Sequence, residues 1–353
     1  MNLRLLIGGS PSKLFHLNEF SGELMKLGIE TKLVLDTDYC DGFPSRKIQN
    51  WFQTKRRFNN IIKQFKPDAI FIDRHRHFGV AAIKTGIPLI VHIRGDHWKE
   101  ITMARQTLYK SLPKKFVLKR WEKMAEQCFQ NSTLMLPICQ YLENIVKEKY
   151  PTKNVATLHQ GITPSRWYHM DGMNLKHPCV GLLQGAVIFE KAKEMLMLEH
   201  VLKSLPHVTF YWVGDGPYRD YVLDRLKKYE NFKWLGRLDY PNKVREYLSG
   251  IDIYALITGI DMSPLTLLEA QLMERPVIAT KVGGIPELMK DLETGYLIEK
   301  GATQDLIDKI NILLTDTNQS KEMGKSGKKF VTEKFSWDVI SKKFLVTIKN
   351  YIN

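Results

Sequence analysis

The sequence is poor in cysteine and contains no long apolar run. Its 353 residues include 4 cysteines, which are scattered and form neither a C-x-x-C motif nor a His–Cys cluster at metal spacing: Cys40, Cys128, Cys139 and Cys179. This pattern argues against a disulfide-rich secreted domain and a zinc module, and we expect buried free thiols. The apolar run at the N-terminus stops at glycines after a few residues, so neither a signal peptide nor a spanning helix fits. We therefore expect a cytoplasmic protein without a metal site or a cofactor.

Acidic residues are scarce in the first half of the chain. Residues 1–170 carry 27 Lys+Arg against 14 Asp+Glu, a net charge of +13, whereas the remainder carries 52 − 27 = 25 against 38 − 14 = 24, a net charge of +1. The formal charge of +14 therefore belongs almost entirely to the first half. General solubility would not need such an uneven distribution, which favours an anionic partner.

Two segments of this half combine basic and aromatic residues. The first has no acid: Arg46, Lys47, Lys55, Arg56, Arg57, Lys63 and Lys66 alternate with Trp51, Phe52, Phe58 and Phe65. The second has Glu122 as its only acid: Arg105, Lys110, Lys114, Lys115, Lys119, Arg120 and Lys123 accompany Tyr109, Phe116 and Trp121. The pattern predicts that the first half lies on an anionic membrane surface, peripherally and at the inner face. The alternative is two solvated helices whose aromatic residues pack into the core.

Short apolar runs alternate with helix-length segments along the whole chain. In the first half we expect strands at Leu3–Ile7, Thr31–Leu35, Ala69–Asp73, Leu89–Ile93, Leu134–Ile138 and Val155–Leu158. In the second half we expect strands at Cys179–Leu183, Val208–Val213, Lys233–Leu235, Ile253–Ile257, Val277–Thr280 and Tyr296–Ile298. This βαβ alternation predicts an α/β fold with parallel sheets covered on both faces.

A stretch rich in glycine, proline and polar residues, Gly161–Pro178, separates the two halves. We predict an N-terminal domain at 1–168, a C-terminal domain at 172–335, and a last helix at 336–353 that returns to the N-terminal domain. Two Rossmann-like domains that face one another would place their strand ends, and hence the ligand, in the cleft between them.

The most specific segment runs from Asp261 to Glu269, two acids separated by seven residues. Ser263 suits an N-cap and Pro264 the first helical position, so the free amides of the helix start would attract a diphosphate. Glu269 lies about one turn inside this helix, where it can accept hydrogen bonds from ribose hydroxyls. The alternative is a buried helix with an acidic first turn.

The segment as a whole resembles the acid-x7-acid signature of the family 4 retaining glycosyltransferases of the GT-B fold. The likeness includes Leu267–Leu268, the Pro-Val-Ile-Ala-Thr strand at 276–280 and the Gly-Gly-Ile-Pro-Glu turn at 283–287. The resemblance implies that the first acid contacts the transferred sugar and that the second contacts the ribose. Here the first acid is Asp261 instead of the usual Glu, one methylene shorter.

Further turns in the second half resemble the same family. Gly214 and Gly216 match its Gly-x-Gly-Pro turn, and Gly236-Arg237 the segment whose backbone reads the nucleobase. Gly185 and Lys191 match its phosphate clamp, but Ala186 replaces the clamp's arginine. The resemblance implies donor binding by a set of residues in this half: Gly185, Gly214, Gly216, Gly236, Arg237, Ser263, Pro264, Leu265, Thr266 and Glu269.

In the first half, Gly8-Gly9 resembles the family's glycine loop at the donor phosphates; a plain turn is the alternative. Arg94, where many relatives have histidine, ends an expected strand, and we predict that it replaces the missing clamp arginine. Asp96 and His97 either bind the acceptor or form a local ion pair. His75 and His77 follow another expected strand, and we place them at the surface.

The resemblance implies a hexosyltransferase that retains anomeric configuration without a metal. Lys191, Arg94 and Asp261 are its candidate catalytic residues, the donor is a nucleoside diphosphate sugar of the UDP or GDP type, and the acceptor is lipid-linked or a glycan. One alternative is a nucleotide-sugar epimerase or hydrolase on the same fold. Another is a non-catalytic sugar-nucleotide or nucleic-acid binder, although the sequence contains no known nucleic-acid module. We expect no nucleic-acid partner.

Overall fold

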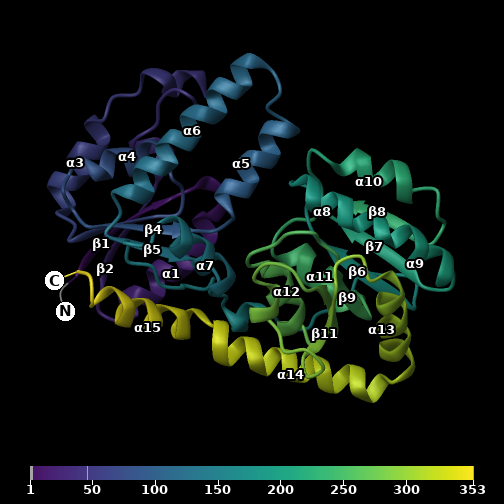
Figure 1. Ribbon diagram of the computed structural model, residues 1–353. Coiled ribbons are helices and arrows are strands. Elements are labelled where there is room, and N and C mark those ends of the chain that lie inside the picture. Colours follow the sequence, from purple (N-terminus) through teal and green to yellow (C-terminus); the bar gives the residue numbers. More distant parts are fainter. Residues whose placement is uncertain (1–2, 46, 353) are drawn as a thin grey trace. The chain divides into compact units, whose positions relative to one another are not determined.

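The computed structural model describes residues 3–45 and 47–352, and the chain divides into two compact units (Figure 1). The N-terminal unit comprises Met1–Gly161 together with Trp337–Asn353, and the C-terminal unit comprises Ile162–Ser336. The chain therefore passes from the N-terminal to the C-terminal unit after residue 161. The predicted N-terminal domain ended at residue 168, seven residues later.

The N-terminal unit is built on a parallel sheet with the strand order β2-β1-β3-β4-β5. These strands are β1 (Arg4–Gly9), β2 (Glu30–Leu35), β3 (Ala69–Ile72), β4 (Leu89–Ile93) and β5 (Leu134–Pro137). Strand order reverses between β1 and β3. In doubly wound sheets, ligands bind outside the carboxyl ends of the strands at such a point.

The helices of this unit are α1 (Leu14–Lys26), α2 (Asp36–Tyr39), α3 (Arg56–Phe65), α4 (His77–Ile83), α5 (His97–Gln106), α6 (Leu112–Gln130), α7 (Gln140–Lys149) and α15 (Trp337–Ile348). The last of them, α15, packs against α1 although more than 300 residues separate them in the chain (Figure 1). Phe20 of α1 lies 5.3 Å from Trp337 and 5.1 Å from Phe344, measured between ring centroids. The Trp337 indole N–H also donates to Glu19 Oε2 over 3.0 Å. The end of the chain thus completes the core of the N-terminal unit.

The C-terminal unit has a parallel sheet with the strand order β11-β10-β9-β6-β7-β8. Its strands are β6 (Cys179–Leu183), β7 (Thr209–Val213), β8 (Phe232–Gly236), β9 (Ile253–Leu256), β10 (Val277–Thr280) and β11 (Gly295–Ile298). Counted from β6, this is the 3-2-1-4-5-6 order of the doubly wound dinucleotide-binding fold, and its direction reverses between β6 and β9.

Helices cover both faces of the second sheet, and each face has its own apolar core. They are α8 (Phe189–Glu194), α9 (Leu198–Ser204), α10 (Arg219–Leu226), α11 (Asn242–Gly250), α12 (Leu265–Leu272), α13 (Thr303–Thr315) and α14 (Thr317–Phe335). Trp212 and Phe210 fill one core, and Tyr247 and Tyr254 lie in the other. Because both faces are buried, the strands read as almost uninterrupted apolar runs, which is why the sequence predicts them well.

One predicted strand is wrong. Val155–Leu158 forms a single bridge between Val155 and Met135 rather than a strand. The segment does run beside β5, because the Leu158 amide donates to the Pro137 carbonyl over 2.9 Å. Pro137 has no N–H to donate in return, so the parallel ladder cannot continue at that residue.

None of the helices within the described part of the chain is both long and apolar enough to cross a lipid bilayer.

Candidate active site

The switch point of the C-terminal sheet brings Lys191 and Asp261 into contact. Lys191 lies on α8, which follows β6, and Asp261 lies in the loop that follows β9, the neighbouring strand across the reversal. The Lys191 ammonium forms a hydrogen-bonded ion pair with Asp261 Oδ2, and both side chains are largely buried, at 17% and 14% exposure. The sequence predicted each residue for the site, and the fold places them side by side despite the 70 residues between them.

The Asp261 loop is fixed by backbone contacts with a glycine turn. The Gly284 amide donates to the Asp261 carbonyl over 3.0 Å, and the Met262 amide donates to Asp261 Oδ1 over 2.9 Å. A Cβ at Gly283, which has φ +54°, would lie 2.0 Å from the Asp261 carbonyl oxygen. Only glycine allows this approach. The Gly283-Gly284 turn therefore sets the position of the Asp261 carboxylate.

The start of α12 differs from the predicted capping pattern. Helix α12 begins at Leu265 with Pro264 as its N-cap residue, and Ser263 lies one position too early to cap it. The Ser263 hydroxyl is buried and makes no hydrogen bond within the described chain. Proline cannot offer a side-chain cap, so the first amides of α12, which begin at Leu265 and Thr266, lack the capping bond that serine would give.

Thr266 and Glu269 are both oriented by tyrosines. The buried Tyr254 hydroxyl donates to Thr266 Oγ1 over 2.8 Å, so the Thr266 side chain points into the core and leaves only its backbone for a ligand. Glu269 is buried, and the Tyr240 hydroxyl donates to its Oε1 over 3.1 Å. Tyr240 was absent from the predicted site residues. It is half-exposed at 43%, so it stands between Glu269 and the surface.

Two glycine turns at the ends of β6 and β7 interlock. A Cβ at Gly214 would lie 2.0 Å from the Gln184 carbonyl oxygen, and one at Gly216 would lie 2.4 Å from the Ala186 carbonyl oxygen. The Ala186 amide donates to the Asp215 carbonyl over 3.0 Å. Side chains are excluded from this contact, so the residues around Gly185 follow the backbone of the Gly214–Gly216 turn.

The remaining donor residues predicted in this unit lie at the end of β8. The Gly214 amide donates to the Gly236 carbonyl over 2.8 Å, which joins this strand end to the interlocked turns. Arg237, the next residue, is exposed. Ala186, by contrast, is fully buried, at 0% exposure. An arginine side chain at this position would therefore have to enter the apolar core in which Ala186 lies.

At the switch point of the N-terminal sheet, Ser10 makes two hydrogen bonds to the Asp73 carboxylate. The Ser10 amide donates to Asp73 Oδ1 and its hydroxyl donates to Asp73 Oδ2, each over 3.0 Å. Gly8 and Gly9 end β1 beneath apolar side chains: a Cβ at Gly8 would lie 2.5 Å from the Phe78 ring, and one at Gly9 would lie 2.7 Å from Leu17. Packing alone therefore accounts for glycine at both positions.

Arg94 lines a cavity of about 330 Å³ within the N-terminal unit. The cavity lies beyond the carboxyl ends of β3 and β4, and its basic wall consists of Arg74, Arg76 and Arg94. Arg74 makes two hydrogen bonds to Asp36, of 2.6 and 2.7 Å, and the Arg76 guanidinium lies 3.7 Å from the centroid of the Trp121 ring. Arg94 has no hydrogen bond within the described chain. Burial lowers its pKa, and the Asp73 carboxylate acts in the opposite direction.

Arg74 and Arg76 were absent from the site residues that we predicted from the sequence. Both follow β3 directly, and a basic residue in that position of a parallel strand points to the ligand edge of the sheet.

Asp96 and His97 do not form the ion pair that was one of the two predicted alternatives. Asp96 caps α5, because its Oδ1 accepts the Lys99 amide over 3.0 Å. His97 lines the cavity, and burial lowers its pKa to about 4. Its ring lies 5.6 Å from Phe129 and 6.0 Å from His75, between centroids. Asp96 thus caps α5 and His97 lines the cavity, and acceptor binding by both residues stays a prediction.

The surface positions predicted for His75 and His77 are wrong. Burial lowers the pKa of His75 to about 3, and its ring packs 4.6 Å from Phe129. His77 begins α4, and its Nδ1 lies 3.2 Å from Asp41 Oδ1. His75 does lie in the predicted loop, between β3 and α4, whereas His77 is the first residue of α4, and both side chains are half-buried.

A second group of polar residues lies at the opposite edge of the C-terminal sheet. Within the described residues, one set of three groups has metal-like spacing: His177, Cys179 and Asp252. The Asp252 carboxylate already accepts the Cys179 amide over 2.7 Å and lies 2.8 Å from His177 Nδ1, and burial raises the pKa of the Cys179 thiol to about 12. A cavity of about 710 Å³ lies at the same edge. This is the amino end of the strands, away from the switch point, so we do not place the active site there.

The Lys191–Asp261 arrangement lies in a segment with known relatives. Residues 183–316 match the protein family described as glycosyl transferases group 1. This segment is therefore similar to a group 1 glycosyl transferase domain. This domain contains Lys191, the Asp261 loop and Glu269, and hence both residues of the central ion pair.

Curated relatives of the chain include several named transferases. It is 30% identical over 156 residues to the sulfoquinovosyl transferase SQD2 of Arabidopsis thaliana, covering 43% of this chain and 30% of that protein. It is 30% identical over 197 residues to the N-acetyl-alpha-D-glucosaminyl L-malate synthase of Bacillus anthracis, covering 52% of this chain and 51% of that protein. It is 31% identical over 155 residues to a GDP-mannose-dependent monoacylated alpha-(1-6)-phosphatidylinositol monomannoside mannosyltransferase of Corynebacterium glutamicum, covering 41% of this chain and 40% of that protein. These matches span about half or less of the relatives' own length.

Solved structures resemble the chain over nearly its full length. Sucrose-phosphate synthase from Thermosynechococcus elongatus superposes with a TM-score of 0.73 at 14% identity, covering 99% of both chains. HepE from Anabaena, in complex with UDP-glucose, superposes with a TM-score of 0.71 at 16% identity, covering 99% of this chain and 100% of that chain. At this identity the likeness shows the fold, which is the GT-B fold of two parallel-sheet α/β domains. The predicted fold class is thereby confirmed.

Proposed function

We propose that this protein is a retaining glycosyltransferase that moves a hexose-type sugar from a nucleoside diphosphate sugar to a membrane-linked or glycan acceptor. The observation that carries this proposal is the buried Lys191–Asp261 ion pair at the switch point of the group 1 glycosyl transferase domain. A cation and a carboxylate held together at a strand end match the two parts of the donor, an anionic diphosphate and a sugar rich in hydroxyls.

In this proposal the donor diphosphate lies at the start of α12. The first amides of that helix, at Leu265 and Thr266, favour an anion. The buried Ser263 hydroxyl beside them offers a donor that the described chain does not use, which supports a polar ligand at this point. Glu269, one turn further along, receives the ribose, and the neighbouring Tyr240 hydroxyl orients its carboxylate. The turns around Gly185, Gly214, Gly216 and Gly236, with Arg237, receive the nucleotide.

The proposed transfer needs no nucleophile from the protein and no metal ion. The acceptor oxygen forms a bond to the anomeric carbon on the face from which the diphosphate leaves. The bond from that carbon to the phosphate oxygen breaks, and the leaving nucleoside diphosphate takes the acceptor's proton. Lys191 then neutralises charge on the departing phosphate, and Asp261 holds the sugar hydroxyls. Arg94 of the N-terminal unit is proposed as a second cation for the leaving group, and the Gly8-Gly9 loop as a backbone contact to the phosphates.

We propose that the acceptor binds the N-terminal unit in the cavity lined by Arg74, Arg76 and Arg94. His97, neutral at physiological pH, lines the same cavity and can accept or donate one hydrogen bond to an acceptor hydroxyl. We further propose that this unit rests on an anionic membrane at its inner face. The name of the Corynebacterium relative includes a lipid and that of a Staphylococcus aureus relative includes poly(ribitol-phosphate), and both support an acceptor of this kind.

A donor screen with site variants tests the proposal. Purified protein is heated with UDP-, GDP- and ADP-sugars, and a true donor raises the melting temperature because it binds only the folded state. Glu269→Gln should reduce this shift, whereas Asp261→Asn and Arg94→Ala should keep it and slow sugar transfer by about 100-fold or more. Asp224→Asn, on the exposed side of α10, and Lys84→Ala, after α4, are the controls and should match the wild type in both measurements.

The result that overturns the proposal is a donor shift and a turnover that none of the three site variants changes. Consumption of the sugar nucleotide at an undiminished rate without any acceptor would instead favour the hydrolase alternative.

A further inference from the structure

We infer that one face of the N-terminal unit, the basic-aromatic face, docks on an anionic lipid bilayer by inserting apolar side chains between lysines. This face comprises Lys47, Ile48, Trp51, Phe52 and Lys55 from the first basic segment, and Leu108, Lys110, Leu112, Lys114, Lys115, Phe116 and Lys119 from the α5–α6 corner. The inference deepens the proposed function, on which it rests for the idea of a membrane-linked acceptor. It specifies where the membrane lies on the molecule.

The apolar tips of this face are unusually exposed for large side chains. Phe52 is 85% exposed, Leu112 81%, Ile48 67% and Phe116 55%. Phe58 of the first segment behaves differently: it is buried and packs 5.0 Å from Phe78 in the core. The predicted core alternative therefore holds for Phe58. The four apolar tips, by contrast, are exposed to solvent.

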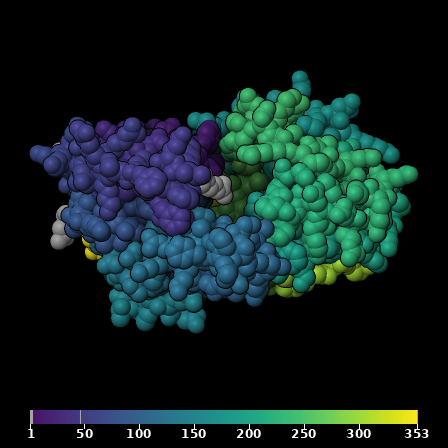
Figure 2. All heavy atoms as spheres, turned by 90° about the horizontal axis from the view of Figure 1, so that it is seen from above, coloured from purple at the N-terminus to yellow at the C-terminus, as the bar shows by residue number. Residues whose placement is uncertain are grey.

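Contacts between side chains bring the two segments together. The Phe43 ring lies 4.8 Å from Trp51 and 6.2 Å from Phe116, between centroids, and the Trp121 indole N–H of α6 donates to the Pro44 carbonyl over 3.2 Å. In the space-filling view of Figure 2, the indigo surface of the first segment accordingly adjoins the blue surface of α5 and α6. Residues more than 60 positions apart thus form one continuous face.

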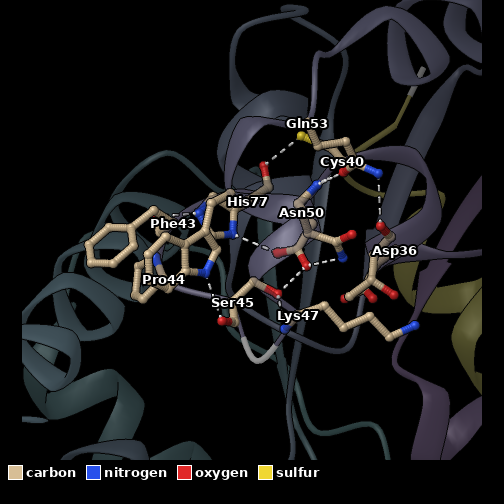
Figure 3. A network of polar contacts seen from close by, with 12 residues as sticks. Asp36, Cys40, Phe43, Pro44, Ser45, Lys47, Asn50, Gln53 and His77 are labelled. Atoms are coloured by element: carbon tan, nitrogen blue, oxygen red, sulfur yellow. Dashed lines mark hydrogen bonds and ion pairs between the residues drawn. The ribbon is translucent and has the colours of Figure 1, made fainter.

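A polar network holds the first segment in its exposed conformation (Figure 3). Asp41 is its centre: Oδ2 accepts from the Ser45 hydroxyl over 2.6 Å and from the Asn50 amide group over 2.8 Å, and the Asp41 amide donates to Gln53 Oε1. His77 joins the network at Asp41 Oδ1, and its Nε2 lies 3.0 Å from the Phe43 carbonyl oxygen.

The same network fixes the tryptophan of the segment. The Trp51 indole N–H donates to the Ser45 carbonyl over 2.9 Å. Ile48 and Phe52 flank Trp51 on the same one-and-a-half-turn 3-10 segment, Ile48–Phe52, so their positions are set as well. The exposure of these apolar tips is therefore built into the fold, because more than five hydrogen bonds would have to break before the loop could bury them.

The charge around the tips matches an anionic surface. Six lysines of the face are exposed and pair with no carboxylate among the described residues: Lys47, Lys55, Lys110, Lys114, Lys115 and Lys119. The one acid of the second segment, Glu122, is already bonded to Arg105 over 2.9 Å. Arg46, which the sequence counted in the first segment, lies outside the described residues. Each basic residue near an anionic bilayer contributes about 1 kcal/mol, and apolar insertion adds to this.

The side-chain types favour a bilayer over the other anionic partners. Ile48 and Leu112 are aliphatic and stand at the tips, where they can enter acyl chains but cannot stack on bases as nucleic-acid platforms do. Protein interfaces are depleted in lysine at their centres, whereas here lysines alternate with the apolar tips. Long lysine side chains can bury their methylenes and keep the ammonium group at the headgroups.

The arginine-lined cavity lies next to this face. Trp121 forms a wall of the cavity and bonds to Pro44, and Tyr109, another wall residue, lies 5.9 Å from Trp121. A membrane-anchored acceptor held at the face would thus have its headgroup close to Arg76. This adjacency is what links the docking surface to the acceptor site.

Co-sedimentation of the full chain with vesicles tests the inference. One set of vesicles is pure phosphatidylcholine, and the other is phosphatidylcholine with about 30% of the anionic lipid phosphatidylglycerol. We expect the wild type to bind the anionic vesicles at least about tenfold more tightly at low salt, with a steep loss as salt rises. The double variant Phe52→Ser, Leu112→Ser should weaken binding by about tenfold while keeping every charge. Lys114→Glu, Lys115→Glu should nearly abolish it.

Matched controls separate this face from general surface effects. Leu292→Ser changes a side chain that is 68% exposed in the C-terminal unit, and Lys321→Glu, Lys329→Glu reverses two exposed lysines of α14. Both controls should bind the anionic vesicles as the wild type does. All variants should melt at the wild-type temperature and keep the donor-induced shift, because the changed side chains lie on the surface.

The inference is overturned if the wild type binds neutral and anionic vesicles equally, or if both face variants bind the anionic vesicles as the wild type does. Binding of a single-stranded oligonucleotide that is tighter than vesicle binding and depends on the same lysines would also overturn it in favour of nucleic acid. Loss of the donor shift with intact vesicle binding would contradict only the proposed function, so the two ideas fail independently.

Discussion

Lys191 and Asp261 illustrate how a single contact gives a site its chemistry. A salt bridge on a solvated surface is worth little, but this one is largely buried, so removal of one partner leaves the other with an uncompensated charge. In the substrate complex the same cation would face the diphosphate. In the proposed mechanism Lys191 therefore has one role in the free protein and another in catalysis.

Replacement of Lys191 by alanine should reduce sugar transfer by about 100-fold or more, since one preorganised cation at a leaving group contributes about 3 kcal/mol. Lys193 lies two positions further along α8 and is exposed, so Lys193→Ala is a matched control that should transfer at the wild-type rate. Steady-state turnover with the best donor measures both. Equal rates for the two variants would remove Lys191 from the mechanism.

The buried histidines of the N-terminal unit should make stability fall at acidic pH. Burial, together with the nearby Arg76, lowers the pKa of His97 to about 4 from an unfolded value of 6.5. The carboxylates of Glu126 and Asp96 act in the opposite direction. The unfolded chain therefore binds more protons between pH 6.5 and 4, and the free energy of unfolding decreases as pH falls through that window.

The wild type should lose part of its free energy of unfolding between pH 7 and pH 5. His97→Phe should make this loss smaller by about 1–2 kcal/mol. Urea unfolding at the two pH values measures this difference. His207→Phe, at an exposed position of the C-terminal unit, should leave the pH dependence as it is in the wild type. A His97→Phe protein with the full wild-type loss would show that His97 is protonated in the folded state.

At the scale of elements, the interlocked turns after β6 and β7 form one of the two tightest backbone contacts of the candidate site. Gly214→Ala places a methyl group 2.0 Å from the Gln184 carbonyl oxygen, which forces the two turns apart. We expect a loss of about 2–3 kcal/mol in the free energy of unfolding and a loss of donor binding.

Gly236→Ala is the matched comparison for Gly214→Ala. Gly236 has φ +73°, but its Cβ would meet open space, so only the backbone conformation penalises alanine, by about 1 kcal/mol. Urea unfolding and the donor-induced thermal shift distinguish the two variants. If both lost the same stability, the predicted clash at Gly214 would be relieved at no cost.

The elements also show what the sequence could and could not predict. Strands buried on both faces were found because their apolar runs are continuous. Val155–Leu158 was wrongly assigned because Pro137, a residue of the neighbouring strand, stops the ladder, and no local pattern reports that. Ser263 was assigned as the cap because serine prefers that position, yet the chain enters α12 through Pro264. The motifs predicted Lys191 and Asp261 as site residues. They could not predict the ion pair between the two side chains, because it is a tertiary contact.

At the scale of the whole molecule, the N-terminal unit depends on the end of the chain. Trp337 is buried against Gly161 and Phe20, and a large-to-small change in such a position costs about 3–5 kcal/mol. Trp337→Ala should therefore destabilise the N-terminal unit and leave donor binding by the C-terminal unit in place. Val346→Ser, on the same helix but 67% exposed, should have little effect.

Limited proteolysis followed by mass spectrometry locates the destabilised unit. In Trp337→Ala, new cleavage sites should fall within residues 3–161, and the fragment from 162 to 336 should survive. Cleavage spread evenly over both units would contradict the assignment of α15 to the N-terminal core.

The packing of α15 on α1 also sets an order of events during synthesis. A ribosome makes α1 before every strand of the C-terminal sheet but makes α15 after all of them. Multidomain chains usually fold from the N-terminus while they are being made, at about 5–20 residues per second. Here the C-terminal unit is one continuous segment and can fold first. The apolar side of α1 stays exposed to solvent during that time. We therefore expect the nascent chain to need protection at Phe20, for example by a chaperone, until α15 has left the exit tunnel.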